Sequence, residues 1–569
     1  MHAPPSPALV TPPAVRRLPR WVPWLLIAAY VLPGFLGRDP WRGAELTAFA
    51  VMLDMRDGGP WLIPQVLGET VQPLAWLPYW LGAAAMRGLP LPAGWAAQLP
   101  FMALLLLTLA CTWYTTYRLA RQTAALPLQP AFGQGVRPAD YGRATADGAL
   151  LALVATLGLA MLGHETSAAA VQLAAVALLG WAGTRAWPPA DAPRRRWELA
   201  QGLAATWVSA LMLALAGAPW LTVGLTVALA GWWWRTGVRP LAAALAALAG
   251  LAALGTTAVL AWHAGAPLPG WPVGLDWDDA NEWRGLLRLL AWFWWPSALL
   301  ALWALWRWRW HLAQPHVGWP LTVVLLVLAF CILDSGNDRV LLLALPALAT
   351  LAAWALPTLR GSLAAAIDWF ALVLFTGAAA IVWIIWLAMM TGVPPKPAAN
   401  VARLVPGFQP AFEPVLVTVA AAASLLWLGV AGWRIGRHAP ALWKGLVLSA
   451  SGLTLNWLLL MTLWLPLLNW GLGLRPISER IAALVPRGAC VAVVGLSAGD
   501  LGALRHHGGL TLRRLRTPDA ASCPLLLAGP RTPHGELHGW VLRAEIPRLR
   551  ASRERWRLYE RPRAAADAP

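Results

Sequence analysis

The ionisable residues that could do chemistry lie in short polar stretches between long apolar segments. Carboxylates can act as general bases, and arginine binds phosphate through paired charge-assisted hydrogen bonds. This combination predicts a site that removes a proton from one group and holds a phosphate on another. The candidate residues, in chain order, are Asp39, Arg42, Glu45, Glu69, His164, Glu165 and Arg339.

Several of these residues also have a purely structural explanation. Glu45 could be a solvated residue of a surface helix, and Asp39 before Pro40 could only turn the chain. Arg339 could pair with its neighbour Asp338 on the surface, which is worth under about 1 kcal/mol. The pair His164-Glu165 fits a short turn as well as it fits a site.

Metal and nucleotide chemistry find little support in the sequence. The chain contains no GxxxxGK[ST] loop, no nucleotide-binding glycine fingerprint and no HExxH motif. The acidic run WDWDDANE (Asp276, Asp278, Asp279, Glu282) is typical of a solvated loop, because hard cations need more ordered ligand spacing. We therefore predict no metal ligands, and a requirement for a divalent metal stays open.

The composition is that of a membrane protein. Hydrophobic residues make up 59% of the chain and charged residues only 12%, which is too apolar for a soluble multidomain protein. The net charge of +18 does not indicate a nucleic-acid partner, because basic residues such as Arg194, Arg195 and Arg196 recur in loops between apolar segments. There they orient membrane spans and meet anionic lipid head groups, so we expect membrane lipids as partners.

Thirteen apolar segments have about the length that crosses a bilayer. Basic residues are enriched in alternate loops, beginning with Arg16, Arg17 and Arg20, which predicts a cytoplasmic N-terminus and a C-terminus on the other side. The predicted spans are residues 21–37, 94–117, 144–163, 166–187, 199–216, 218–234, 240–262, 286–306, 318–333, 340–357, 369–390, 413–433 and 445–470.

Three parts of the chain lie outside this pattern. Residues 1–20 form a Pro-rich cytoplasmic N-terminus that we expect to be disordered. Residues 38–93 form a long outside loop with a surface helix at 44–56 and a shorter apolar helix at 74–88. Residues 475–569 alternate short strand-like strings with a helix, which predicts a small α/β domain. Cys490 and Cys523 in this domain are permitted a disulfide on the oxidising side.

The layout and several short motifs resemble the GT-C membrane glycosyltransferases, in the branch with the lipid A aminoarabinose transferase and the protein O-mannosyltransferases. The resemblance covers nearly the whole chain, although its individual motifs are loose. The residues that carry it are Ala44-Glu45, Trp61-Leu62-Ile63-Pro64, Gly68-Glu69, Tyr79-Trp80-Leu81-Gly82, Gln98-Leu99-Pro100, His164-Glu165, Asp338-Arg339 and Arg475-Pro476.

The resemblance implies an all-α polytopic membrane fold with a small C-terminal α/β periplasmic domain, in the bacterial inner membrane. It implies transfer of a sugar from a polyprenyl-phosphate carrier to a lipid or protein acceptor on the periplasmic side. Glu45, Asp39 or Glu165 would then supply the catalytic carboxylate, and Arg42 and Arg339 would bind the carrier phosphate. His164 and Glu69 would belong to the same site.

The chain departs from the family at four polar positions, if it is aligned on Trp61. The family's catalytic aspartate falls at Ala44, its lysine at Ala75, its arginine at Gln98 and a further acid near Ala169. The alternative hypothesis is therefore a catalytically degenerate protein that binds a lipid-linked glycan or a partner. A transporter or flippase is disfavoured, because the predicted spans contain almost no ionisable residues.

Overall fold

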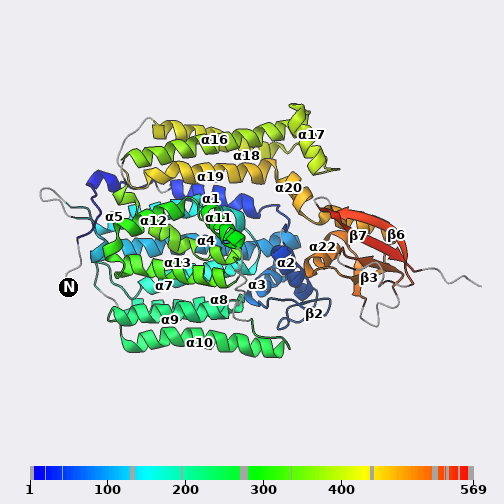
Figure 1. Ribbon diagram of the computed structural model, residues 1–569, viewed down its shortest axis with the longest axis horizontal. Coiled ribbons are helices and arrows are strands. Elements are labelled where there is room, and N and C mark those ends of the chain that lie inside the picture. The colour runs from blue at the N-terminus through cyan, green and yellow to red at the C-terminus, as the bar shows by residue number, and fades with distance from the viewer. Residues whose placement is uncertain are drawn as a thin grey trace, which may run out of the picture.

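The computed structural model shows a long helical bundle with a small sheet domain at one end (Figure 1). The structure describes residues 5–561, except 20, 42, 129–134, 194–195, 270–279, 335, 360, 436–440, 516–522, 531, 533–536, 538 and 549–550. The Arg42 candidate, and Asp276, Asp278 and Asp279 of the acidic run, lie outside the described residues.

Helix occupies each of the thirteen segments that the sequence predicts as spans. The helices of the bundle are α1 (Trp21–Phe35), α4 (Ala93–Ala120), α5 (Pro138–Ala155), α6 (Leu157–Leu162), α7 (Ala168–Thr184), α8 (Arg196–Leu215), α9 (Pro219–Arg235), α10 (Pro240–His263), α11 (Ala280–Phe293), α12 (Ser297–Arg307), α13 (Pro315–Leu333), α14 (Asp338–Leu342), α15 (Leu345–Ala353), α16 (Gly361–Thr391), α18 (Pro414–Ile435), α19 (Lys444–Leu463) and α20 (Leu465–Leu472).

Seven of the helices in the described part of the chain are long and apolar enough to cross a membrane on their own: α4, α8, α10, α13, α16, α18 and α19. The chain is therefore a multi-pass membrane protein. Three further apolar helices, α1, α7 and Leu345–Thr358, are shorter. The number of thirteen spans stays a prediction.

Four of the predicted spans are broken helices. One break bends α11 and α12 by 92° at Pro296, because proline lacks an N–H and disfavours helix in the residue before it. Thr156 separates α5 from α6, residues 343–344 separate α14 from α15, and Trp464 separates α19 from α20. Apolar length alone does not reveal such breaks.

The long loop between α1 and α4 contains both expected helices, α2 (Gly43–Arg56) and α3 (Leu77–Gly88). It also contains a small hairpin of β1 (Gln65–Val66) and β2 (Glu69–Thr70), which the sequence analysis did not predict. We expected α2 to lie on the membrane surface, but most of its side chains are buried beneath α3 and the C-terminal domain. A further helix, α17 (Pro395–Leu404), lies in the Pro-rich segment after α16.

The C-terminal domain is α/β, as predicted. Its five strands lie in the order β4-β3-β5-β7-β6, with the first three parallel and the last two antiparallel to their neighbours. A disulfide joins Cys490 and Cys523. The elements are α21 (Arg475–Leu484), β3 (Cys490–Val494), α22 (Ala498–Gly508), β4 (Thr511–Arg514), β5 (Leu525–Ala528), β6 (Val541–Arg548) and β7 (Ala551–Glu560).

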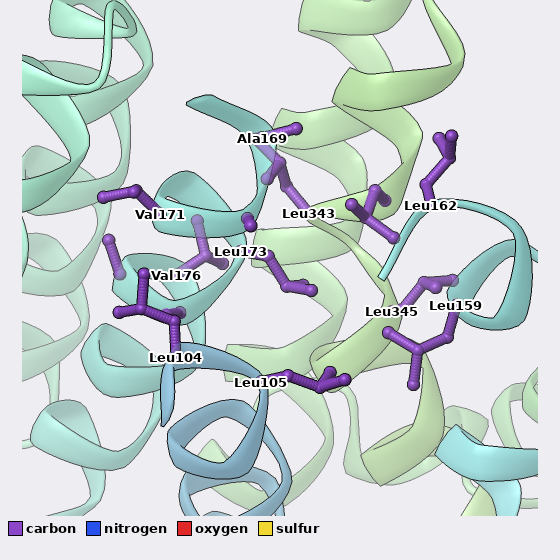
Figure 2. Close-up of a cluster of buried hydrophobic side chains, with 14 of the residues drawn as sticks. Leu104, Leu105, Leu159, Leu162, Ala169, Val171, Leu173, Val176, Leu343 and Leu345 are labelled. Carbon is purple, nitrogen blue, oxygen red and sulfur yellow. The ribbon is translucent and has the colours of Figure 1, made fainter. Parts of the chain in front are cut away.

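One apolar core runs through the bundle and continues into one face of the sheet. Figure 2 shows a part of it where side chains of α4, α6, α7 and α15 meet. Ala169 and Leu343 belong to this cluster, and both also line the cavity described in the next subsection. The packed core therefore forms part of the wall of that cavity.

The C-terminal domain docks on the bundle by a close contact between α22 and α2. Two glycines make the contact possible: a Cβ at Gly499 would lie 2.8 Å from the Leu46 Cβ, and one at Gly502 would lie 2.8 Å from the Ala50 Cα. At the end of α22, Arg505 donates to Asp54 and to Asp57 at 3.0 Å each. The other face of α2 lines the cavity, so this contact positions part of its wall.

We predict that Gly502→Val separates α22 from α2. Overpacking of this kind costs about 1–3 kcal/mol, so the backbone amides of residues 43–56 should exchange hydrogen for deuterium faster than in the wild type. The control is Gly231→Val on α9, where an added Cβ meets no atom within 4 Å. Unchanged exchange in α2 would contradict this account of the contact.

Candidate functional site

A cavity of about 800 Å³ lies at the end of the bundle that carries the C-terminal domain. Segments far apart in the sequence form its wall: the start of α2, residues 71–75, the start of α7, the turn between α8 and α9, residues 267–269, and the connection from α13 to α14. Its size is in the range of small-molecule sites. Its polar lining residues are Thr47, Gln72, Tyr79, Ser167, Gln172, Asp334, Asn337 and Arg339.

Residues 165–167 organise one side of this cavity. The backbone is extended at Ser167, just before α7 begins, and successive side chains of an extended chain point in opposite directions. Glu165 reaches Arg339, Thr166 reaches Glu45, and Ser167 lines the cavity. The Ser167 hydroxyl is buried and has no hydrogen-bond partner among the described residues. It is therefore available to a ligand.

Arg339 is the cationic residue of the cavity wall in the described part of the chain. Its Nε and Nη2 donate to the two carboxylate oxygens of Glu165 at 3.2 Å each, while its Nη1 lies 3.6 Å from Asp338. The Glu165 side chain is 3% exposed and that of Arg339 27%. The buried carboxylate thus fixes the guanidinium plane and leaves one edge towards the cavity. A guanidinium held in this way can bind phosphate.

Asp334 is a carboxylate of the cavity wall that the sequence analysis did not consider. It caps the end of α13, and Asn337 donates from Nδ2 to its Oδ2 at 2.8 Å. Asn337 also accepts from the backbone N–H of Arg339 and so caps the start of α14. Asn337 therefore forms hydrogen bonds with both Asp334 and Arg339. The signal in the sequence is the polar run from Asp334 to Arg339 between two apolar helices.

Glu45 does not line the cavity, although it lies next to residues that do. It is 1% exposed and forms an ion pair with buried Arg38. Its carboxylate also accepts from the Trp41 N–H at 3.1 Å, the Thr166 N–H at 3.1 Å and the Thr166 hydroxyl at 3.3 Å. With its oxygens engaged in this way, Glu45 joins three segments.

Three of the four departures from the family pattern meet in the cavity wall. Ala44, Ala75 and Ala169 all line it, from α2, from the segment before α3, and from α7. The fourth, Gln98, is buried elsewhere and donates to the Arg38 carbonyl at 2.6 Å. The alignment on Trp61 thus found positions that are neighbours in space. In this chain, alanine methyl groups occupy the three positions where the family pattern predicts two acidic residues and a lysine.

The other candidates lie away from the cavity. Asp39 is near Arg475 and His506 at the junction with the C-terminal domain, where burial raises its pKa. Glu69 in the β-hairpin pairs with Arg514 of β4 at 2.6 Å. His164 is buried, bonds the Tyr30 carbonyl through Nε2 at 3.0 Å, and stacks on Trp457. The structure therefore brings together Glu165 and Arg339, with Glu45 behind them.

The C-terminal domain contains a serine motif that the reading of the sequence missed. Residues 495–499 (GLSAG) match the GxSxG pattern between a strand and a helix. However, Ser497 has an ordinary extended backbone (φ −73°, ψ 159°), and its hydroxyl exchanges hydrogen bonds with Asp500 in a capping box of α22. This serine begins a helix and is not a strained, presented nucleophile.

No metal-binding cluster is visible within the described ranges: no three His, Cys, Asp or Glu side chains are close enough to hold an ion. Glu282 of the acidic run is described, at the start of α11, as an exposed residue. The polar side chains that line the cavity include Arg339, Asp334, Asn337 and Ser167.

Comparisons with known proteins place the fold. No family model and no curated protein matches the chain. Two solved structures do match: ArnT from Cupriavidus metallidurans bound to undecaprenyl phosphate, with a TM-score of 0.61 and 17% identity, and the apo state of the same protein, with a TM-score of 0.57 and 15% identity. Each alignment covers 96% of this chain and 99% of the other. ArnT is the lipid A aminoarabinose transferase, a GT-C glycosyltransferase. The resemblance inferred from the sequence is confirmed for the fold: the chain has the architecture of the GT-C enzyme ArnT over nearly its whole length.

Proposed function

We propose that this protein is a membrane glycosyltransferase that moves a sugar from a polyprenyl-phosphate carrier to a lipid or protein acceptor. The observation that carries the proposal is Arg339, which buried Glu165 fixes in the wall of an 800 Å³ cavity. In support, the fold matches that of ArnT, whose structure was solved with undecaprenyl phosphate bound. We place the reaction on the periplasmic side of the bacterial inner membrane, opposite the N-terminus.

Arg339 would bind the phosphate of the carrier. Two of its donors are used by Glu165, and its Nη1 remains directed to Asp338 and the cavity side. The phosphate would be drawn to the guanidinium and could also accept from the Ser167 hydroxyl. Such charge-assisted bonds strengthen as negative charge develops on the leaving phosphate, which stabilises the transition state.

Asp334 would act as the general base. The acceptor oxygen would bond to the anomeric carbon while the bond from that carbon to the phosphate oxygen breaks. The phosphate would leave with the bonding electrons towards Arg339, and the acceptor proton would pass to Asp334. Glu45, Asp39 and Glu165 were expected in the catalytic role; we now assign Glu45 and Glu165 as positioning residues, because both are engaged with buried or cavity-wall partners.

A second candidate function is binding of a lipid-linked glycan without turnover. The observation in its favour is that Ala44, Ala75 and Ala169 all line the cavity. If these positions carried the chemistry in related folds, this cavity would retain the phosphate-binding arginine and lack the rest. Binding and turnover must therefore be measured separately.

We predict that Arg339→Ala weakens binding of undecaprenyl phosphate by about 10-fold or more, because a hydrogen bond to a charged group contributes about 1.5–3 kcal/mol. Glu165→Gln should weaken binding less, since the arginine keeps its charge but loses its fixed orientation. Binding can be measured by titration of the purified protein in detergent. Arg403→Ala, on exposed α17, is the control. Equal affinity in Arg339→Ala and wild type would remove the phosphate role.

We predict that Asp334→Asn lowers transfer of label from a polyprenyl-phosphate sugar by about 10²–10⁴-fold, the usual contribution of a positioned base. Affinity for undecaprenyl phosphate should be unchanged, and Glu413→Gln, an exposed acid before α18, should behave as wild type. Wild-type protein that binds the carrier but transfers no pentose or hexose to any membrane acceptor would instead support the second candidate.

We predict that Glu45→Gln lowers the thermal stability of the purified protein as well as its activity. Breaking a buried ion pair by removing one charge costs about 3–5 kcal/mol, whereas Glu479→Gln breaks an exposed pair with Arg475 and should cost under about 1 kcal/mol. A Glu45→Gln protein that melts like wild type yet has lost transfer would show that Glu45 is the base after all.

A further inference from the structure

A second large cavity lies at the opposite end of the bundle from the C-terminal domain. It measures about 660 Å³ and is open to the outside. Its walls come from the N-terminal segment before α1, from the starts of α16 and α19, and from the end of α18. None of the residues assigned to the sugar-transfer site lines it. In Figure 1, α16 and α18 form the outer edge of the bundle.

Three charged side chains line this cavity. Arg434, in the last turn of α18, forms an ion pair with Asp368 of α16 through the Asp368 Oδ2. Lys444, the first residue of α19, is 6% exposed and lies over the Trp433 ring, 5.2 Å from its centroid. The described lining residues thus carry two positive charges and one negative charge. Among the described residues, this surplus of positive charge favours an anionic ligand.

The carboxylate adds a second requirement. Asp368 is 9% exposed, and its Oδ1 has no hydrogen-bond partner in the part of the chain that the structure describes. A buried carboxylate oxygen without a donor is costly, and a hydroxyl or amine on a ligand would supply one. The ligand should thus combine a single anionic group with a hydrogen-bond donor.

The remaining wall is apolar and reaches the surface of the bundle. Leu372 and Leu448 line it, and Trp369 at its edge is 61% exposed. Arg434 lies in the last turn of α18 and Lys444 is the first residue of α19, while Asp368 lies two turns into α16. The ends of membrane helices are where side chains meet lipid head groups. The cavity therefore offers a polar part at head-group depth and an apolar part beside it.

We propose that this cavity binds one anionic glycerophospholipid whose head group carries a single phosphodiester charge and free hydroxyl groups, as in phosphatidylglycerol. The phosphate lies against Lys444 and Arg434, a head-group hydroxyl donates to Asp368, and an acyl chain follows Trp369 and Leu372. A zwitterionic lipid would leave the net charge of the cavity uncompensated. A free sugar phosphate would leave the apolar wall in contact with water.

The experiment is native mass spectrometry of the purified full-length chain, delipidated and titrated with phosphatidylglycerol, phosphatidylethanolamine or phosphatidylcholine of identical acyl chains. The wild type should bind its first phosphatidylglycerol at least about 10-fold more tightly than either zwitterionic lipid. Glycerol 3-phosphate, a soluble phosphate monoester without acyl chains, should not compete. Equal affinity for the three lipids, or competition by glycerol 3-phosphate, would overturn the assignment to an anionic lipid.

The chain supplies its own matched control, because it contains two lysines, Lys444 in the cavity and Lys396 on α17. Lys444→Gln should abolish the preference for phosphatidylglycerol, while Lys396→Gln and Lys444→Arg should keep it. If Lys444→Gln does not fold, Gly445→Phe tests the same cavity without a change of charge. An added Cβ at Gly445 meets no atom within 4 Å, so the ring can enter the cavity and block it. Retained preference in both Lys444→Gln and Gly445→Phe would refute the site.

Discussion

The buried carboxylate of Glu45 is the constraint on which the candidate site depends. A charge removed from water is tolerated only where ion pairing and hydrogen bonds replace its hydration. Glu45 obtains them from three segments: Arg38 and Trp41 before α2, its own helix, and Thr166 before α7. On either side of Thr166, Glu165 orients Arg339 and Ser167 lines the cavity. The hydrogen bonds of buried Glu45 thus hold the segment that supplies polar residues to the cavity wall.

Two broken helices lie next to this charge network in the chain: α6 ends shortly before Glu165, and α14 begins with Asp338 and Arg339. Non-helical backbone within a membrane protein is stable only where protein or a water-filled cavity satisfies its polar groups. At the break between α5 and α6, the Thr156 and Ser297 hydroxyls bond each other at 2.7 Å, and Ser297 donates to the Ala152 carbonyl at 3.0 Å. The turn between α13 and α14 is satisfied by Asn337, and this turn supplies the carboxylate and the arginine of the site.

The sequence predicted which segments are helical much better than it predicted which side chains meet. Apolar length located all thirteen helical segments, and alternating short strings located β3, β5, β6 and β7, because both signals are periodic and local. The direction of a polar side chain is not local: Glu45 is seven residues after Arg38, and nothing in that spacing shows that the two are buried together. Asp334 was missed for the same reason, since an acid after an apolar run looks like any helix end. Alignment on Trp61, unlike periodicity, did identify residues that meet in space, because Ala44, Ala75 and Ala169 line the same cavity.

The contact between α2 and α22 has a consequence for how the protein is made. Arg505 and Asp54 are separated by 451 positions in the chain, so α2 receives its second face only after nearly all of the protein has been synthesised. Until then Leu46 and Ala50 lack the cover that Gly499 and Gly502 provide. A ribosome-bound or prematurely terminated chain would therefore carry every bundle residue of the cavity and still have a mobile wall. The last domain to emerge therefore completes the packing around α2.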